Sequence, residues 1–405
     1  MKVFVLGAGV AGLAFASFAE GLDLTVIDSN DFAGRKLLAT GNGRCNFTNK
    51  NFSYAYYQSS DPDFFKKALD GFTNEDLIDY FHQLGIATTS LPSGRCYPLT
   101  MSAKSVRDVL YLKARENAKF IFNEKIIDID LDKGLLIGQN NKYKYDILVL
   151  AGGGITLKNL GSDGSIYKIL EKFHPISKIS YGITNYKTQE KLSKKAKGCK
   201  VSGKLSLYID GSLRKDSTDD IIFQAYGLTG TAVFDLSNEI SLALMAGKKP
   251  EVRVDFLPSY GQEELGTKIK TLAGRYPKRL IGQILLGLVN ERLIGDILKK
   301  ARIDESLFAK DLSERDMDML VKILKQMTFH IRDIYDRQNA QVSLGGFSTK
   351  YIDKQTMASK IYKNLYFCGE IMDVSGSCGG YNIQWAFSSA KAASDTIRSM
   401  NVQNK

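Results

Sequence analysis

The chain has 405 residues, five cysteines and a formal net charge of +11 at pH 7. A chain of this length is expected to fold as two or three domains, and no stretch approaches the roughly 20 apolar residues that cross a membrane. Because the cysteine number is odd and no pair has CxxC spacing, a disulfide framework and a zinc site are not expected. We therefore predict a protein of the reducing cytoplasm without a metal site.

The N-terminus has the pattern of a dinucleotide-binding turn. An apolar strand is predicted over residues 2–6, followed by the glycine-rich run GAGVAG, a helical stretch and a second strand that ends at Asp28, 21 residues after Gly7. In this pattern Gly7 makes the tight turn, Gly9 lets a pyrophosphate approach, and Gly12 lets the helix pack on the strand. Asp28 would accept a hydrogen bond from a ribose hydroxyl and would repel a 2′-phosphate.

The next segment favours FAD over NAD. Residues 34–49 read GRKLLATGNGRCNFTN, a glycine-rich cationic loop where a simple NAD dehydrogenase would continue to its next helix. Arg35 and Lys36 could neutralise phosphates, and Gly41 and Gly43 would let the backbone approach a flat ring system.

The middle of the chain changes pattern twice. The run ILVLAGGG at 147–154 is predicted to be a further strand of the first domain, not a second nucleotide site, because no helical run opens on its glycines. Beyond it, a long helical stretch is predicted over 259–325, with Ser313 as an N-cap. Short alternating runs before and after that stretch predict strands at 203–210, 220–227, 251–257 and 340–348.

The C-terminal region is unusually dense in polar and glycine residues. The stretch GEIMDVSGSCGGYNIQWAFSSA, residues 369–390, follows an apolar strand and leads into an alanine-rich helix. Such a strand, glycine turn and helix start directs backbone N–H groups and the positive helix end at an electron-rich ligand. Trp385 and Phe387 are interpreted as core residues and not as flavin-stacking ones.

The excess positive charge is partly local. Residues 178–204 contain eight lysines and one glutamate. The run has no arginine to grip phosphate in bidentate fashion, and its aromatic residues do not alternate regularly with the lysines. We interpret it as a solvated loop and expect no nucleic-acid partner.

The loop at 34–49 and the stretch at 369–390 resemble the two end signatures of the BaiN/RdsA family of FAD-dependent oxidoreductases. Looser matches follow in the same order at 93–103, 147–154, 221–232 and 341–360, so the resemblance extends from residue 1 to residue 397. It implies an α/β fold: an FAD-binding Rossmann-like domain of the two-dinucleotide-binding type, with an inserted β-rich, barrel-like domain that carries a helical subdomain. The expected boundaries are 1–179 and 346–405 for the FAD domain, 180–258 with 326–345 for the β-rich domain, and 259–325 for the helical insertion.

The residues and the resemblance together give a predicted cofactor site. In the family the C-terminal strand and helix approach the ribityl chain and the flavin, which implies direct contact by Asp373. The predicted FAD-binding residues are Gly7, Gly9, Val10, Ala11, Gly12, Asp28, Ser29, Arg35, Lys36, Gly41, Gly43, Arg44, Cys45, Asn46, Ala151, Gly152, Gly153, Gly369, Glu370, Asp373, Gly379, Gly380, Tyr381, Asn382 and Ile383. Cys45 and Cys378 are interpreted as inert thiols, because no CxxxxC disulfide-reductase spacing exists.

The expected function is FAD-dependent oxidoreduction of a small organic substrate, with NAD(P)H or oxygen as the other partner. No side chain is an obvious acid or base, since flavin itself takes the hydride, and the catalytic residues stay unassigned. Tyr226, Thr229, Tyr381 and Asn382 are candidates for orienting the substrate. The resemblance suggests reduction of an unsaturated or keto compound such as a bile acid, or oxidation of a small amine.

Several alternatives stay open. The chain could be a flavin-containing RNA-modification protein or a non-catalytic flavin redox sensor. One dinucleotide site is counted, so NAD(P)H would bind only transiently, and a monomer or homodimer is expected. The chain departs from the family at Ala225, where the family has a histidine. If that histidine shapes the substrate site, the departure implies another substrate or a weaker activity.

Overall fold

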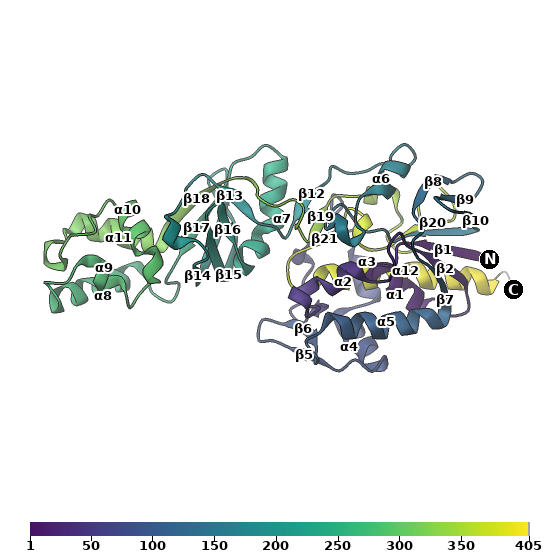
Figure 1. Ribbon diagram of the computed structural model, residues 1–405, viewed down its shortest axis with the longest axis horizontal. Helices are drawn as coiled ribbons and strands as arrows, with labels where there is room; N and C mark the ends of the chain where they lie inside the picture. The colour runs from purple at the N-terminus through teal and green to yellow at the C-terminus, as the bar shows by residue number, and fades with distance from the viewer. Residues whose placement is uncertain (404–405) are drawn as a thin grey trace. The chain divides into compact units, whose positions relative to one another are not determined.

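The structure is a computed structural model that describes residues 1–403. Contacts divide the chain into two compact units (Figure 1). Unit 1 contains Met1–Tyr181 together with the segment that begins at Gln338, and unit 2 contains Gly182–Arg337. Unit 2 is therefore inserted into the sequence of unit 1.

The core of unit 1 is a five-stranded sheet with strand order β20-β11-β1-β2-β7, in which all neighbours are parallel. Its strands are β1 (Lys2–Leu6), β2 (Asp23–Ile27), β7 (Ala118–Ile121), β11 (Ile147–Leu150) and β20 (Leu365–Phe367). The β11 and β1 strands read as continuous apolar runs because parallel strands are buried on both faces. The strand that begins the run at 147–154 therefore pairs with the N-terminal strand inside the same sheet.

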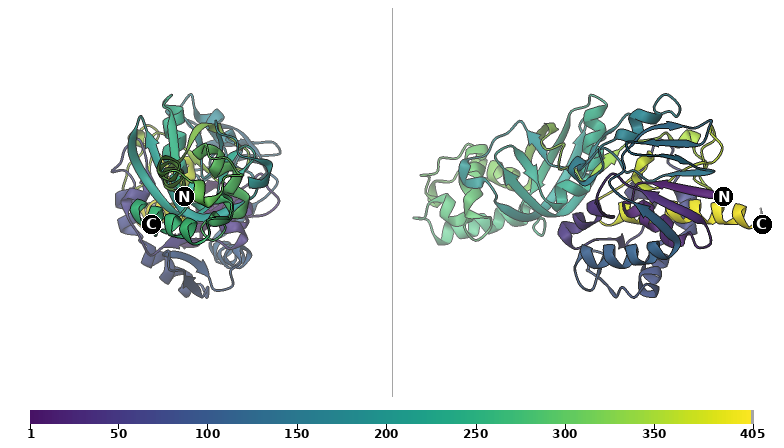
Figure 2. Two further views of the ribbon diagram at one scale, coloured as in Figure 1. Left: turned by 90° about the vertical axis from the view of Figure 1, so that its left-hand side faces the viewer. Right: turned by 45° about the vertical axis from the view of Figure 1, so that its right-hand side comes forward.

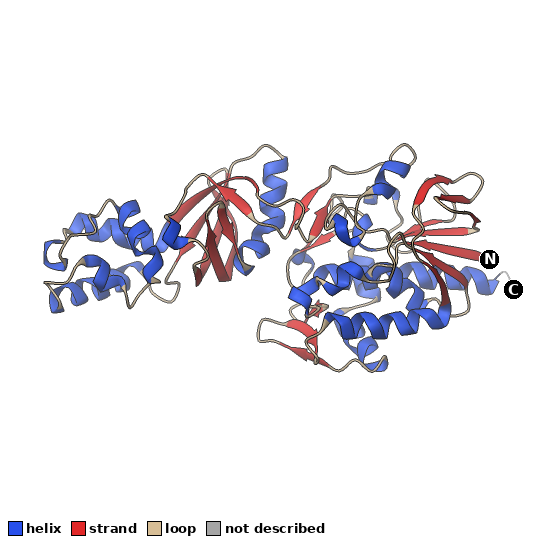
Figure 3. Cartoon of the chain, viewed as in Figure 1, coloured by secondary structure: helices blue, strands red, loops and turns tan. Residues whose placement is uncertain are grey.

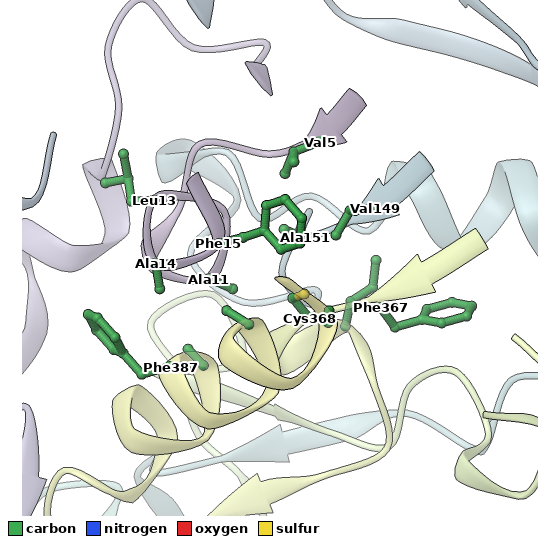
Figure 4. Close-up of a cluster of buried hydrophobic side chains, with 14 of the residues drawn as sticks. Val5, Ala11, Leu13, Ala14, Phe15, Val149, Ala151, Phe367, Cys368 and Phe387 are labelled. Carbon is green, nitrogen blue, oxygen red and sulfur yellow. The ribbon is translucent and has the colours of Figure 1, made fainter. Parts of the chain in front are cut away.

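Three helices pack together on one face of this sheet (Figures 1 and 2). They are α1 (Val10–Phe18), α5 (Ala103–Asn117) and α12 (Tyr381–Gln403). Figure 4 shows how side chains from β1, α1, β11, β20 and α12 meet in the core, among them Phe15, Phe367 and Phe387. The first and last segments of the chain thus share one hydrophobic core, which brings the two end motifs into the same unit.

The remaining elements of unit 1 surround this core. Its other helices are α2 (Arg35–Leu38), α3 (Lys66–Gly71), α4 (Asn74–Gln83) and α6 (Ser165–Leu170). Its smaller sheets and short strands are β3 (Thr48–Asn49), β4 (Tyr57–Gln58), β5 (Thr88–Ser90), β6 (Arg95–Pro98), β8 (Ile126–Asp130), β9 (Leu135–Gly138), β10 (Lys142–Lys144), β19 (Val342–Leu344) and β21 (Ser375–Gly376). The short strand β12 (Ser180–Gly182) ends where unit 2 begins.

Unit 2 contains a closed antiparallel barrel (red strands in Figure 3). The strand order is β13-β16-β15-β14-β17-β18. The strands are β13 (Tyr186–Thr188), β14 (Lys200–Ile209), β15 (Ser212–Gln224), β16 (Gly227–Thr229), β17 (Pro250–Asp255) and β18 (Met327–Ile334), and helix α7 (Thr231–Met245) follows β16. Alternating burial along β14 matches the alternating apolar residues of its sequence, as a barrel wall requires.

A group of helices is inserted between β17 and β18. It contains α8 (Gln262–Arg275), α9 (Ile281–Leu285), α10 (Glu291–Ala301) and α11 (Glu314–Gln326). Ser313 caps α11 as predicted, because its hydroxyl accepts a hydrogen bond from the Asp316 N–H. The apolar stretch from Ile281 to Ala301 is divided into two helices, because the side chain of Asn290 caps a new helix by accepting from the Arg292 N–H at 3.1 Å.

The predicted fold class is confirmed: a Rossmann-type unit with a parallel sheet carries an inserted antiparallel β-rich unit with helices. The structure differs from the expected boundaries at 338–345, which belong to unit 1. In this segment the Ser343 N–H donates to Glu370 at 2.7 Å, and a Cβ on Gly345 would lie 2.3 Å from the Lys178 carbonyl oxygen.

None of the helices in residues 1–403 is long and apolar enough to cross a membrane.

Candidate cofactor site

A deep cleft opens in unit 1 where the parallel strands of the central sheet end. The residues that follow β1, β2, β11 and β20 at their carboxyl ends all contribute to its wall. Such a crevice is where open parallel sheets bind ligands. The space between the atoms that line it is about 1340 Å³, and this figure includes open solvent at the mouth of the cleft.

Fourteen of the predicted cofactor residues line this cleft. They are Gly7, Gly9, Val10, Ala11, Asp28, Ser29, Arg35, Lys36, Ala151, Gly152, Gly153, Glu370, Asn382 and Ile383. The cleft thus gathers the N-terminal turn, the loop after β11 and the start of α12, which are hundreds of residues apart in sequence. Whether each of them touches the cofactor stays a prediction.

The three glycines of the N-terminal turn have different surroundings. Gly7 has φ +105°, and a Cβ there would lie 2.5 Å from the Ala151 carbonyl oxygen. A Cβ on Gly12 would lie 1.9 Å from the Gly7 carbonyl oxygen, so Gly12 permits helix packing. A Cβ on Gly9 would meet no atom within 4 Å, although Gly9 is the N-cap of α1 and lines the cleft. Gly9 therefore faces an open space at a helix N-terminus, where an anionic pyrophosphate is favoured.

Asp28 is fixed in place by three hydrogen bonds. Its Oδ2 accepts from the Ala8 N–H at 2.6 Å, and its Oδ1 accepts from the backbone and side-chain nitrogens of Asn30, both at 2.8 Å. The Ala8 bond ties the end of β2 to the glycine turn. An anchored carboxylate at this position can accept a ribose hydroxyl without reorganisation, as Rossmann sites require.

A half-buried ion pair crosses the cleft wall. Lys36 Nζ lies 2.7 Å from Glu370 Oε2 and also donates to Thr156 Oγ1 at 2.9 Å. Glu370 in turn accepts from the Ser343 N–H. The side chains are 21% and 19% exposed, so the pair is less screened than a surface ion pair. The charge of Lys36 is therefore paired with that of Glu370. The neighbouring Arg35 points to a different partner, because its Nη1 donates to Asn30 Oδ1 at 3.0 Å.

The loop before α6 also lines the cleft, and the sequence analysis did not assign it to the site. It contributes Gly161, Ser162, Asp163 and Gly164. Ser162 is buried, and its hydroxyl has no hydrogen-bond partner among the described residues. Asp163 pairs with Lys125, another cleft residue, at 3.2 Å. The glycine turn directly before a helix was the available signal for this loop.

Further residues missing from the predicted set line the cleft from neighbouring segments. Among them are Asn30, Thr40, Glu124, Ile126, Leu160, Tyr167, Gln341 and Val342. Tyr167 is buried and donates to the Ile371 carbonyl oxygen at 3.0 Å. Burial and the nearby Glu370 carboxylate raise the pKa of Tyr167, which keeps its hydroxyl protonated as a donor.

The other predicted cofactor residues do not line this cleft. They are Gly12, Gly41, Gly43, Arg44, Cys45, Asn46, Gly369, Asp373, Gly379, Gly380 and Tyr381. Asp373 is buried and accepts from the Ser60 N–H at 3.4 Å. Burial raises the pKa of the Cys45 thiol to about 12, so this thiol is protonated at neutral pH.

The start of α12 is braced by its own side chains. Asn382 exchanges two hydrogen bonds with Gly376, donating to the carbonyl oxygen and accepting from the N–H, both at 2.8 Å. Tyr381 is buried, stacks on Tyr56 and donates to the Asn51 carbonyl oxygen at 3.0 Å. Trp385 and Phe387 are buried in the core, and Trp385 Nε1 donates to the Gly369 carbonyl oxygen. The hydrogen-bonding atoms of Tyr381 and Asn382 thus hold the turn before the helix.

The other two candidates for orienting a substrate lie in unit 2. Tyr226, between β15 and β16, stacks on Tyr335. Thr229, the last residue of β16, donates its hydroxyl hydrogen to Asn185 Oδ1. These two candidates therefore lie close to one another in the barrel unit.

The residues of the cleft fit FAD. The open space at Gly9 would accept the pyrophosphate against the α1 N-terminus, and Asp28 would hold the adenosine ribose. The unpartnered hydroxyl of Ser162 needs a partner from a ligand or water. The start of α12 contributes Asn382 and Ile383 to the same cleft.

Comparisons with known proteins identify the family. The family described as HI0933-like protein Rossmann domain matches residues 1–396. The 3-dehydro-bile acid delta(4,6)-reductase of Clostridium scindens is 30% identical over 400 residues, covering 97% of this chain and 98% of that protein. The ribosomal RNA dihydrouridine synthase of Haemophilus influenzae is 29% identical over 405 residues, covering 97% of each chain.

The solved structures to which the chain is similar are more distant in sequence. The 3-ketosteroid delta1-dehydrogenase of Sterolibacterium denitrificans is 12% identical, with a TM-score of 0.46 and coverage of 98% of this chain and 99% of that one. The family match spans nearly the whole sequence and confirms the resemblance drawn from the two end motifs. The chain belongs to the HI0933-like Rossmann-domain family.

Proposed function

We propose that this chain, an FAD-dependent oxidoreductase, reduces a carbon–carbon double bond that is conjugated to a carbonyl group in a small planar substrate. The observation that carries the proposal is the cleft at the carboxyl edge of the parallel sheet, with open space at Gly9 and an anchored carboxylate at Asp28. That arrangement supports an adenine dinucleotide. The reaction class comes from the chemistry that the relatives share.

The names of two relatives describe related reductions. A delta(4,6)-reductase of a 3-dehydro bile acid acts on ring double bonds of a ketone, and a dihydrouridine synthase saturates a ring double bond of uracil. In both cases a hydride and a proton add across a C=C bond that a carbonyl activates. Bound FAD supplies the hydride-transfer chemistry. A reduced nicotinamide is the proposed source of the electrons, and it would bind only transiently.

The residues of this chain would supply binding and position. Gly9 and the α1 N-terminus would hold the pyrophosphate, and Asp28 would hold the ribose. The Lys36–Glu370 pair and its bond to Ser343 fix the segment after β20 against the loop that contains α2. This bracing would keep the start of α12, and with it Asn382, in a fixed position for the flavin end of the cofactor.

The proposal is tested with the reduced holoenzyme. Purified protein is loaded with FAD, reduced photochemically without oxygen and mixed with cyclohex-2-enone or androst-4-ene-3,17-dione. We expect the flavin absorption band to return as the enone is saturated, and the saturated ketone to be recovered as product. Recovery of the band with oxygen but with neither enone would refute the proposed reaction while leaving FAD binding intact.

A second candidate is the modification of RNA, and one observation favours it. Lys191, Lys194, Lys195 and Lys197 are all exposed on a short loop of unit 2. The loop is ordered by α10: the Arg292 Nε donates to the Lys195 carbonyl oxygen at 2.7 Å, and Ser193 donates twice to Asp296. A fixed array of lysines attracts polyanions.

Salt-dependent binding decides between the two candidates. Labelled ribosomal RNA fragments are titrated at about 0.15 M salt, where non-specific binding is expected in the micromolar range or weaker. We expect no tighter affinity. Tighter binding that is lost on K194E/K195E, with FAD content unchanged, would favour RNA as the substrate.

A further inference from the structure

We propose that a cluster in the barrel unit, made by Asn185, Tyr226, Thr229 and Tyr335, binds the flat conjugated ring of the substrate, with the ring stacked on Tyr335. The inference rests on the proposed function, because it gives that function a binding site for the enone. We call these residues the tyrosine cluster. Asn185 and Tyr335 have no role in the predicted site, and they extend the two candidates Tyr226 and Thr229.

The two tyrosine rings form a parallel stack. Their centroids are 3.4 Å apart and their planes differ by 6°. The side chain of Tyr335 is 45% exposed, whereas Tyr226 is only partly exposed. Tyr226 therefore backs Tyr335 and holds its ring in one orientation, and the outer part of the Tyr335 side chain is left to solvent. A ligand that stacks there would not have to immobilise a rotating side chain.

The backbone around the cluster is tightly constrained. The Tyr335 N–H donates to the Asn185 carbonyl oxygen at 2.8 Å, and the Thr188 N–H donates to the Tyr226 carbonyl oxygen at 3.1 Å. Gly227, directly after Tyr226, has φ +149°, and a Cβ there would lie 2.3 Å from the Tyr186 carbonyl oxygen. The loop before β13, the turn between β15 and β16 and the end of β18 are thereby joined at one end of the barrel.

The polar pair beside the rings offers hydrogen-bond donors. The Thr229 hydroxyl donates to Asn185 Oδ1, and this bond sets which way the Asn185 amide faces. The Asn185 Nδ2 then carries two N–H groups, and neither of them donates to an acceptor within residues 1–403. An N–H pair next to an aromatic face suits a carbonyl oxygen in the plane of a stacked ring.

These features select a ligand class. None of the four residues is charged, and burial, Tyr335 and the nearby Asp336 carboxylate raise the pKa of Tyr226. Because that carboxylate would repel an anion, an uncharged ligand is favoured over a carboxylate or phosphate. A stacking face prefers a flat, unsaturated ring over a puckered saturated one. Asn185 lies shortly after the chain enters unit 2, and Tyr335 lies shortly before it leaves. The geometry therefore points to a neutral cyclic enone as the ligand.

The test measures binding to the oxidised, FAD-loaded protein, where no turnover occurs. Equilibrium dialysis gives the affinity for androst-4-ene-3,17-dione and for its saturated analogue 5α-androstane-3,17-dione. The wild type is expected to prefer the enone. Y335A should weaken enone binding at least about fivefold and remove the preference, whereas Y335F keeps the ring and should bind like wild type. N185A should weaken both ketones, because both carry the carbonyl oxygen.

Tyr276 provides a matched control. It is another exposed tyrosine of unit 2, 36% exposed, and it stacks with Arg279 instead of a tyrosine. Y276A should leave both affinities unchanged, and thermal melting of each variant confirms that it is folded. Wild-type affinity in Y335A, or no enone binding to the wild type, would overturn the inference. Tyr335-dependent binding without enone reduction would instead refute the proposed reaction and leave the site standing.

Discussion

At the scale of single residues, a substitution at Gly9 is expected to affect cofactor binding, whereas one at Gly12 is expected to affect folding. Its Cβ would enter open space, whereas a Cβ on Gly12 would collide with the Gly7 backbone at 1.9 Å. We expect G9V to fold with wild-type stability but to lose FAD, because the side chain fills the place of the pyrophosphate. G12A should be destabilised by several kcal/mol, as overpacking of a helix against a strand requires.

The two variants are compared by flavin content after purification and by urea unfolding of the apoproteins. The apoprotein is the proper reference because bound FAD would itself stabilise the wild type. A G9V protein that carries stoichiometric FAD would show that the turn at 7–12 does not bind the pyrophosphate.

His174 gives unit 1 a pH-dependent stability. It is buried against Phe347 and Phe367, and neither ring nitrogen has a hydrogen-bond partner among the described residues. Burial therefore lowers its pKa below the ordinary value of about 6.5. The unfolded chain then binds a proton at a higher pH than the folded chain. Stability is therefore complete above pH 6.5 and is lost as the pH falls from that value through the lower pKa of the folded state.

The prediction is checked by urea midpoints between pH 7.5 and 5.5. H174F removes the titrating group from an aromatic pocket and should flatten the decline of the midpoint with falling pH. H82Q changes an exposed histidine on α4 and serves as the control. If H174F and wild type lose stability in parallel, another group is responsible.

Some residues of the cleft could be predicted from sequence and others could not. Gly7, Gly9 and Asp28 lie within one local strand–turn–helix–strand unit, whose spacing is itself the signal. Lys36 and Glu370 are 334 positions apart and meet only because β1, β11 and β20 lie side by side in one sheet. Ser162 and Asp163 were missed because their glycine turn lacks the fingerprint spacing.

At the scale of elements, helix caps decide where the helical insertion breaks. The sequence predicts one long helical stretch over 259–325, and its apolar periodicity alone does not show the break at residues 286–290. The Asn290 side chain begins α10 by accepting from the Arg292 N–H. A polar cap inside an apolar run is a weak signal when propensity is summed over a long window.

N290A is therefore expected to destabilise the helical insertion. Losing an N-cap costs about 1 kcal/mol, within a range of roughly 0.5–2 kcal/mol. S313A removes the corresponding cap of α11 and should cost a similar amount. N290D and S313D keep a capping acceptor and should be close to wild type. Urea unfolding followed by hydrogen exchange at α10 and α11 measures the effect, and equal protection in N290A and N290D would contradict the capping role.

At the scale of the whole molecule, the fold class could be predicted from the sequence, because apolar residues recur every three to four positions in helices and at alternate positions in strands. The resemblance implied a barrel-like domain, but the alternating runs do not show which strands close it: β13 and β18 pair although they lie more than a hundred residues apart in sequence. The segment 338–345 shows the same limit. Its alternating residues predict a strand, but only the tertiary contacts of Ser343 with Glu370 place it in unit 1.

The number of dinucleotide sites determines how electrons reach the flavin. The described residues of the chain contain one glycine fingerprint, and the cleft that it lines is the proposed FAD site. A nicotinamide donor would therefore have to reach the flavin without a Rossmann site of its own.

We expect reduction of the flavin by NADH or NADPH to be slow and weakly saturating, and reoxidation by oxygen to be detectable. Anaerobic stopped-flow at the flavin band measures the first rate, and mixing the reduced protein with aerated buffer measures the second. A panel of small amines run in parallel identifies an oxidase, which would be reduced rapidly without nicotinamide. Fast reduction that saturates at micromolar NADPH would require a dedicated nicotinamide site.

The family resemblance implies a histidine at the position of Ala225, which is exposed in the turn beside Tyr226. A225H tests this implication. A faster reaction of the reduced flavin with enones, at unchanged FAD content, would show that this position affects the reaction, and an unchanged rate would show that it does not.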